Sequence, residues 1–401
     1  MQTPSHRQNL SSELLAIGER HWQALSEHDL FEPQWCEHQA QICIVFALSD
    51  FVARQCIQHP MFVNELIAYP EQQNQEQDYE ALLNAALNDV TSEEQLHKTL
   101  RLFRHLHMVR ITWADVTNTQ SIEDSLKRVS ALSQALIVQA SLWLRAELSK
   151  RFGLPMGELG EQHMYIIGMG KLGGRELNFS SDIDLIFTYP EQGMTQGGRK
   201  PIEHQQFFTK LAQKLITALH QITVDGQVYR VDMRLRPFGE SGPLVMHFAA
   251  MEDYYQEQGR EWERYAMVKG RVLNPDDTYY PEIADILRPF IYRRYLDYSA
   301  LDSLRKMKAM IKKEVRRRQL SNNIKLGQGG IREAEFIVQS LQLIRGGREP
   351  ALQEQGLLHN LHLLIDMEIL PSEDATLLKN SYLWLRKVEH CLQQFDDKQT
   401  Q

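Results

Sequence analysis

The sequence predicts a predominantly α-helical protein with a central α/β domain. Apolar residues recur at helical spacing over residues 1–160, and helical spacing returns over residues 281–401. Between them, residues 161–275 contain short apolar runs bounded by Gly, Ser and Pro, which indicate buried strands. A chain of 401 residues is long enough for two or three domains with sizeable cores. We therefore expect three regions with these boundaries.

The first region, residues 1–160, is expected to be mostly helical. Its strongest signal is the segment Glu123 to Phe152, where apolar side chains follow helical spacing. Ser121 and Asp124 can form a capping box at its start, and Gly153 with Pro155 ends it. Weaker helical patterns occupy residues 12–28 and 79–115. No residue pattern here indicates chemistry, so we expect this region to support or cover the next one.

The central region, residues 161–275, alternates between strand and helix patterns. Buried strands are predicted at residues 163–170 and 184–189, a helix at residues 203–221, and a turn at Asp225-Gly226. Residues 228–236 alternate between apolar and polar side chains, which is the pattern of a half-buried strand. Its polar face carries an acid among three arginines: Arg230, Asp232, Arg234 and Arg236.

The last region, residues 281–401, is predicted to be helical. A Gly-rich turn at residues 326–330 precedes a helix from Ile331 to about Arg345, and residues 372–397 show a further helical pattern. Residues 301–320 form a basic helix, for which a solvated face is favoured over a binding site. Glu333 and Glu335 are expected to be first-turn acids favoured by the helix dipole.

Composition excludes several classes of protein. The net charge of −8 and pI near 6.0 argue against a protein whose main task is binding nucleic acid. No apolar run approaches membrane-spanning length, and the N-terminal segment lacks the apolar core of a signal peptide. The four cysteines contain no Cys-x-x-Cys pair, so neither a disulfide framework nor a zinc knuckle is indicated. We expect a cytoplasmic protein with no nucleic-acid or membrane partner.

Asp182 and Asp184 form the most informative motif. They follow a glycine-rich turn, Gly168-Met-Gly-Lys-Leu-Gly-Gly174, and enter an apolar run that indicates a strand. Carboxylates at positions i and i+2 project from the same face of a strand, where like charges repel unless a cation lies between them. Mg²⁺ prefers carboxylate oxygens and leaves positions open for substrate phosphates. The motif predicts metal-assisted chemistry on a nucleotide.

Three interpretations of this motif compete. Gly168-x-Gly-x-x-Gly173 matches the dinucleotide-binding fingerprint, but only eight residues separate Gly173 from Asp182, too few for the usual βαβ unit. A structural interpretation makes Asp182 a turn or cap residue and Asp184 a surface acid. The third is a nucleotidyltransferase, in which Asp232 on a neighbouring strand completes a site for two Mg²⁺ ions. We favour this third interpretation, with Asp182, Asp184 and Asp232 as catalytic metal ligands.

Candidate phosphate contacts surround these acids. Arginine's planar group suits phosphate oxygens, although Arg234 and Arg236 could equally form ion pairs with the carboxylates. Lys171 is either a phosphate contact or a solvated surface lysine. Backbone N–H groups of the turn can approach a phosphate closely because glycine has no side chain. The full set of candidate nucleotide-binding residues is Gly170, Lys171, Gly173, Gly174, Ser181, Arg234 and Arg236.

Several long stretches carry a family resemblance. They are residues 168–187, 231–244, 262–269, 323–339 and 345–350. In these stretches the chain resembles the bacterial glutamine synthetase adenylyltransferase/adenylyl-removing enzymes. The resemblance covers most of the chain and is weakest over the first hundred residues. It implies a central nucleotidyltransferase domain of the polymerase-β-like type, and it likens the helical region after residue 281 to a module of uridylyl-transferring and uridylyl-removing enzymes.

The resemblance also implies an activity. Members of that family are more than twice this length and contain two such domains, and this chain resembles the N-terminal, adenylyl-removing half. Inorganic phosphate would attack the AMP attached to a tyrosine of glutamine synthetase and release ADP. The metal ligands Asp182 and Asp184 carry over directly, whereas Asp232 rests on the strand pattern. The implied partners are adenylylated glutamine synthetase, phosphate, ADP and the PII signal protein.

Two rival functions remain. The domain could transfer AMP from ATP to a protein tyrosine, or it could keep the fold and bind a partner without catalysis. Adenylylation and glutamine sensing are not expected here, because the resemblance assigns them to other parts of the family.

Overall fold

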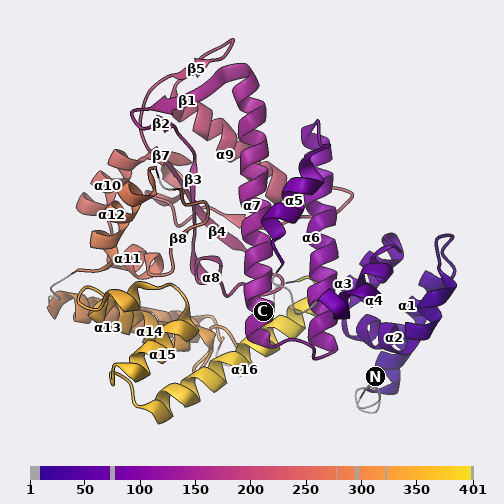
Figure 1. Ribbon diagram of the computed structural model, residues 1–401. Helices are drawn as coiled ribbons and strands as arrows, with labels where there is room; N and C mark the ends of the chain where they lie inside the picture. Colours follow the sequence, from indigo (N-terminus) through magenta and orange to yellow (C-terminus); the bar gives the residue numbers. More distant parts are fainter. Residues whose placement is uncertain (1–9, 73–76, 277, 294–297, 321–322, 399–401) are drawn as a thin grey trace.

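The computed structural model describes residues 10–72, 77–276, 278–293, 298–320 and 323–398 (Figure 1). It is mostly helical, with two small sheets in the central part of the chain. The coarse fold class predicted from the sequence is confirmed. Among the described helices, none combines the length and apolar character needed to span a bilayer.

Up to Phe152 the described part of the first region consists of helices, and strand β1 (Gly153–Gly157) follows directly after them. The longest, α7 (Ile122–Phe152), begins where Ser121 accepts a hydrogen bond from the Asp124 amide, as predicted. The predicted segment 79–115 is two helices, because Ser92 caps a new helix after a turn. The helices before α7 are α1 (Ser12–Ser26), η2 (Pro33–His38), α2 (Gln39–Leu48), α3 (Asp50–Gln58), α4 (Phe62–Gln72), α5 (Tyr79–Leu87) and α6 (Glu93–Val116).

The central region is built on a five-stranded sheet. Strand β4 (Ile183–Tyr189) runs antiparallel to β3 (Tyr165–Gly168) and parallel to both β6 (Val231–Asp232) and β7 (Val245–His247). Strand β8 (Arg271–Val272) pairs with the other side of β3. A separate three-stranded sheet has the order β2–β1–β5, from Gly160–Glu161, Gly153–Gly157 and Thr195–Gly197.

The predicted strand at residues 228–236 is much shorter than expected. Only β6 pairs with the sheet, and the chain turns directly after Asp232. The Asp232 carboxylate accepts a hydrogen bond from the Arg234 amide, a local bond that competes with strand pairing. Further turn bonds follow, from the amides of Arg236 and Gly239. Arg234 and Arg236 therefore lie in a turn rather than on the polar face of a strand.

Apolar side chains cover both faces of the five-stranded sheet. Leu185 and Phe187 belong to a core shared with α7 and α9 (His204–His220). Ile186 points the other way, into a core with α10 (Phe248–Glu257) and α12 (Tyr280–Ile291). Alternate residues of a strand face opposite sides of its sheet, so β4 is buried on both sides. This double burial gives the strand that carries Asp184 a rigid support. The short helices α8 (Gly170–Gly173) and α11 (Glu261–Met267) complete the region.

The C-terminal helices turn back onto the rest of the molecule. They are α13 (Tyr298–Arg317), α14 (Ile331–Arg345), η4 (Pro350–Gln353), α15 (Leu357–Asp366) and α16 (Ser372–Asp396). Figure 1 shows the yellow helix α16 running from α15 toward α6 and α7. Near its end, the Gln394 carbonyl accepts a hydrogen bond from Ser49, and Asp396 forms an ion pair with Arg54. Helix α16 thus contacts the N-terminal helices directly.

Candidate active site

The glycine turn lies behind the acidic strand. The Met169 amide donates a hydrogen bond to the Asp184 carbonyl (2.9 Å), which joins the turn to the start of β4. Gly170 has φ of +55° and faces Asp184: a β-carbon there would lie 3.4 Å from Asp184 Oδ2. Glycine suits this position because L side chains rarely adopt that conformation. The turn therefore places unsubstituted backbone beside a carboxylate.

Asp184 and Asp232 are directly opposite each other in the parallel pairing of β4 and β6. Asp182 and Asp184 flank Ile183, which is fully buried. The expectation that Asp232 lies on a neighbouring strand is confirmed. Burial raises the pKa of Asp184 to about 6, and the charges of Asp232 and Asp182 add to this effect. Such mutual repulsion is relieved by a bound cation.

Guanidinium groups engage the two outer carboxylates. Arg230 Nε lies 2.5 Å from Asp182 Oδ1, and Arg234 Nη2 lies 2.5 Å from Asp232 Oδ2. Side-chain hydrogen bonds from Arg234 lower the pKa of Asp232. The Asp184 carboxylate accepts no hydrogen bond from any residue that the structure describes. Asp184 is therefore the acid whose charge is least compensated.

The fit to a metal ion rests on this donor chemistry. Within the described ranges, no three His, Cys, Asp or Glu side chains gather closely enough to hold a metal as they stand. Carboxylate oxygens suit Mg²⁺, and Asp184 and Asp232 already lie at one level of the sheet. A metal ion at Asp182 or Asp232 would compete with Arg230 or Arg234 for the same carboxylate. The side chain of Arg234 is 72% exposed, so it is free to move.

Lys171 points away from this acidic site. Its ammonium group lies 2.7 Å from Glu389 Oε2 on α16, and its side chain is only 12% exposed. Burial, reinforced by the charge of Arg386, lowers the pKa of Lys171 to about 7. Lys171 is therefore not a solvated surface lysine, and its ammonium group is paired with Glu389; the phosphate contact predicted from the sequence stays a prediction. The sequence missed its partner because 218 residues separate the two.

The remaining glycines and Ser181 have separate environments. A β-carbon on Gly173 would lie 1.7 Å from the Lys269 carbonyl oxygen, so close packing requires glycine there. At Gly174 the nearest atom, the Gln355 carbonyl oxygen, is 3.4 Å away, an ordinary contact. Ser181 lines a cavity of about 570 Å³ next to Arg230. Gly170 is therefore the glycine of this set that borders the carboxylates.

The Arg236 side chain is hydrogen-bonded within its own turn. It donates hydrogen bonds to the carbonyl groups of Met233 (2.7 Å) and Glu240 (3.3 Å). The phosphate role predicted for Arg236 would require these bonds to break. Arg234, in contrast, donates its side-chain hydrogen bonds to Asp232 of the candidate site. The two arginines, which the sequence pattern placed on one face of a strand, therefore have different hydrogen-bond partners.

Other charged residues named from the sequence have structural partners. Glu335 lies beyond the first turn of α14, so the first-turn expectation is wrong for it, and it forms a 2.8 Å ion pair with Lys269. Glu333 accepts a hydrogen bond from the Gly329 amide and closes the glycine-rich turn. On the basic helix α13, Lys306 pairs with Asp302, and two arginines pair with Glu314.

A glycine turn backing an Asp-x-Asp strand, with a third acid opposite on the neighbouring strand, is the arrangement that the sequence predicts for the nucleotidyltransferase class. The model of the glutamate-ammonia ligase adenylyltransferase family matches residues 39–284. The chain belongs to this family. The model of the GlnD PII-uridylyltransferase family matches residues 305–401.

Curated relatives share this similarity over nearly the whole chain. A bifunctional glutamine synthetase adenylyltransferase/adenylyl-removing enzyme of Alteromonas mediterranea is 52% identical over 96% of this chain. Enzymes of the same name from Shewanella loihica and Shewanella oneidensis are 52% and 51% identical over 98% of it. The chain spans only 42% of the length of each of these relatives.

Proposed function

We propose that this chain removes AMP from adenylylated glutamine synthetase by phosphorolysis, using a polymerase-β-like central domain. The observation that carries the proposal is the pairing of Asp184 with Asp232 beside the glycine turn. The relatives are named for both adenylyl transfer and adenylyl removal. Their name supports the substrate, while the direction of transfer follows the resemblance to the adenylyl-removing half.

The proposed reaction exchanges one phosphate ester for one anhydride. An oxygen of inorganic phosphate attacks the phosphorus of the AMP group, and the bond from that phosphorus to the tyrosine oxygen breaks. The products are ADP and tyrosine, whose oxygen takes up a proton. Phosphoryl-type transfer depends on positioning and charge neutralisation more than on covalent chemistry. Phosphate is already an anion near neutral pH, so no histidine base is required.

Side chains of this site would position the reacting phosphate groups. Asp182, Asp184 and Asp232 would hold one or two Mg²⁺ ions, and Mg²⁺ when bound would neutralise charge on the reacting phosphate oxygens. Arg234 would hold the incoming phosphate after releasing Asp232, because its exposed guanidinium group needs to move only a short way. Arg230 would keep Asp182 oriented.

The test is phosphate-dependent formation of ADP from adenylylated glutamine synthetase. We expect activity that requires both phosphate and Mg²⁺. Replacing Asp184 or Asp232 with Asn should reduce turnover by roughly two orders of magnitude or more, since the lost charge acts on the reacting phosphate. The control is Asp285→Asn, because Asp285 is an exposed acid with a 79% exposed side chain in α12.

Each alternative outcome identifies a different function. Incorporation of AMP from ATP into glutamine synthetase, without phosphate-dependent release, would assign the reverse type of transfer. Binding of glutamine synthetase without either reaction would make the chain a partner-binding module.

The PII signal protein is a second proposed partner. It follows from the match of residues 305–401 to a family named for uridylyl transfer to PII. A pull-down with purified PII protein, comparing the whole chain with unrelated controls, tests it.

A further inference from the structure

Helix α16 presents a polar face to the interior of the protein. Tyr382, Arg386, Glu389 and Gln393 follow one another at intervals of four, three and four residues, so they share one face of the helix. All four are at most 2% exposed. An interior face of a helix is normally apolar, because burying charge is costly unless every group is paired. This face therefore needs a specific partner.

That partner is the loop between the glycine turn and the acidic pair. Glu389 Oε2 accepts hydrogen bonds from Lys171 in the glycine turn (2.7 Å) and from the Asn178 side chain within the loop. Arg386 donates to the Asn178 side chain (2.8 Å) and to the Glu176 carbonyl. Although burial opposes its ionisation, Lys171 and Arg386 lower the pKa of Glu389. Helix α16 thus binds both the glycine turn and the loop that follows it.

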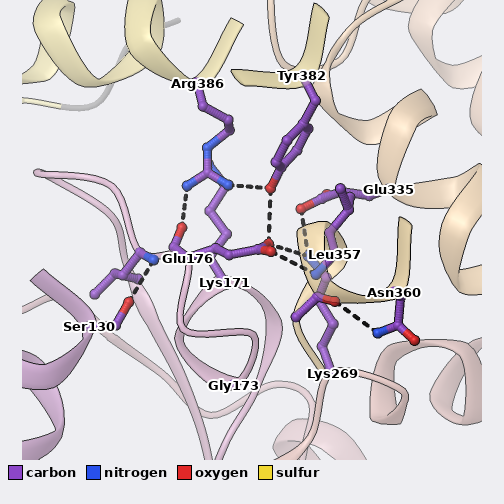
Figure 2. A network of polar contacts seen from close by, with 12 residues as sticks. Ser130, Lys171, Gly173, Glu176, Lys269, Glu335, Leu357, Asn360, Tyr382 and Arg386 are labelled. Carbon is purple, nitrogen blue, oxygen red and sulfur yellow. Dashed lines mark hydrogen bonds and ion pairs between the residues drawn. The ribbon is translucent and has the colours of Figure 1, made fainter. Parts of the chain in front are cut away.

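The same loop is also held through the side chain of Glu176. The Glu176 carboxylate accepts hydrogen bonds from Tyr382 (2.9 Å), from Lys269 (3.4 Å) and from the Leu357 amide (2.7 Å). Figure 2 shows Tyr382, Lys269 and Leu357 around the Glu176 side chain. Lys269 is also paired with Glu335 of α14. Glu176 therefore joins the loop to α14, α15 and α16.

The contacts continue directly to the acidic strand. Gln393 Oε1 accepts a hydrogen bond from the Ser180 amide (2.9 Å). The Ser180 carbonyl accepts one from Arg230 (2.7 Å), and Arg230 is bound to Asp182. A displacement of α16 would therefore be transmitted to Asp182 through two hydrogen bonds and one ion pair. The glycine turn itself is tethered to α16 by Lys171.

We propose that Glu389 is a positioning residue for the reaction and that α16 holds the glycine turn and the aspartates of the catalytic domain in register. Glu389 holds Lys171 and Asn178 at fixed points, so that the loop sets the spacing between the glycine turn and the aspartates. This inference rests on the proposed function. A buried ion pair is a poor source of stability compared with apolar packing, whereas its directional bonds specify one geometry. A role in holding the loop in one conformation explains why this buried face of α16 is polar.

The test separates geometry from folding. The double variant Lys171→Met with Glu389→Leu replaces the closest buried ion pair with apolar groups. Arg386 loses Glu389 as a partner but keeps its hydrogen bonds to Tyr382, Asn178 and the Glu176 carbonyl, so the protein should remain folded. We expect kcat for phosphate-dependent ADP formation to fall about 10- to 100-fold, because small displacements of reacting groups are costly. The KM for adenylylated glutamine synthetase should change little. Glu373→Gln, in the exposed first turn of α16, is the matched control.

Hydrogen exchange provides a readout that does not depend on activity. In the double variant, the amides of residues 175–184 should exchange at least about tenfold faster, because their tethers to α16 are lost. If the double variant fails to fold, Glu389→Gln, which nearly preserves size, is measured in the same two ways. If the wild-type chain lacks phosphorolysis, the proposed function fails and hydrogen exchange alone decides the positioning role. A folded variant with wild-type exchange over residues 175–184 would overturn the inference.

Discussion

Asp184 and Asp232 lie directly opposite each other on two parallel strands, and only Asp232 has a guanidinium partner. This asymmetry leaves the Asp184 carboxylate without the ion pair that Asp232 has. Its raised pKa, about 6, has burial as the first cause and the two neighbouring aspartates as the next. Because a cation and a proton both relieve this repulsion, stability, pH and metal binding are linked at one residue.

The first prediction concerns stability without metal. The folded-state pKa of Asp184 is above its ordinary value, so its contribution to stability is present below pH 4 and is lost as pH rises through 6. Asp184→Asn should therefore raise the free energy of unfolding at pH 7.5 by roughly 2–3 kcal/mol and change it little at pH 4. Denaturant unfolding in EDTA at both values of pH measures this. An equal effect at both would contradict it.

The second prediction concerns Mg²⁺. Magnesium competes with protons for the ionised carboxylates, so millimolar Mg²⁺ should raise the melting temperature more at pH 7.5 than at pH 5. The shift should disappear in Asp184→Asn and should persist in Asp285→Asn, whose substitution lies on an exposed helix surface. Differential scanning calorimetry with and without the metal checks this. An unchanged shift in Asp184→Asn would exclude Asp184 as a ligand.

The third prediction separates Arg234 from Arg236. Arg234→Met should raise the KM for phosphate about tenfold or more while leaving the melting temperature nearly unchanged, because the exposed side chain contributes little to folding. Arg236→Met removes hydrogen bonds to turn carbonyls and should reduce stability by about 1–3 kcal/mol. Steady-state kinetics and thermal melts on both variants give the comparison. Equal kinetic effects in the two would argue against a phosphate role specific to Arg234.

The fourth prediction concerns the glycine turn. Gly173→Ala would place a β-carbon against the Lys269 carbonyl and should destabilise the protein by about 3 kcal/mol or more. Gly174→Ala meets only ordinary contacts and should be nearly neutral. Denaturant midpoints of the two variants provide the measurement. If both were equally destabilised, a requirement other than packing would apply to the turn.

Local patterns were reliable wherever neighbouring residues decide the structure. The buried strand at residues 183–189 and the helix at residues 331–345 follow from apolar runs and from glycine turns that begin or end them. The strand predicted at residues 228–236 is limited to two residues in the structure. The cause is local, but the alternation of apolar and polar residues does not reveal it. The Asp232 side chain bonds the Arg234 amide, and this bond turns the chain after two paired residues.

The sequence by itself determined the helical character of the chain, the acidic strand and the family to which the motifs belong. These depend on periodicity, on turn residues and on residues close together in the chain. Only the tertiary structure decided which charged groups meet. Lys171 and Glu389 are far apart in sequence, and nothing local to either one indicates an ion pair. The reason is physical: a buried charge takes its partner from whichever element the fold packs against it, and helix α16 meets the glycine turn only in the tertiary structure.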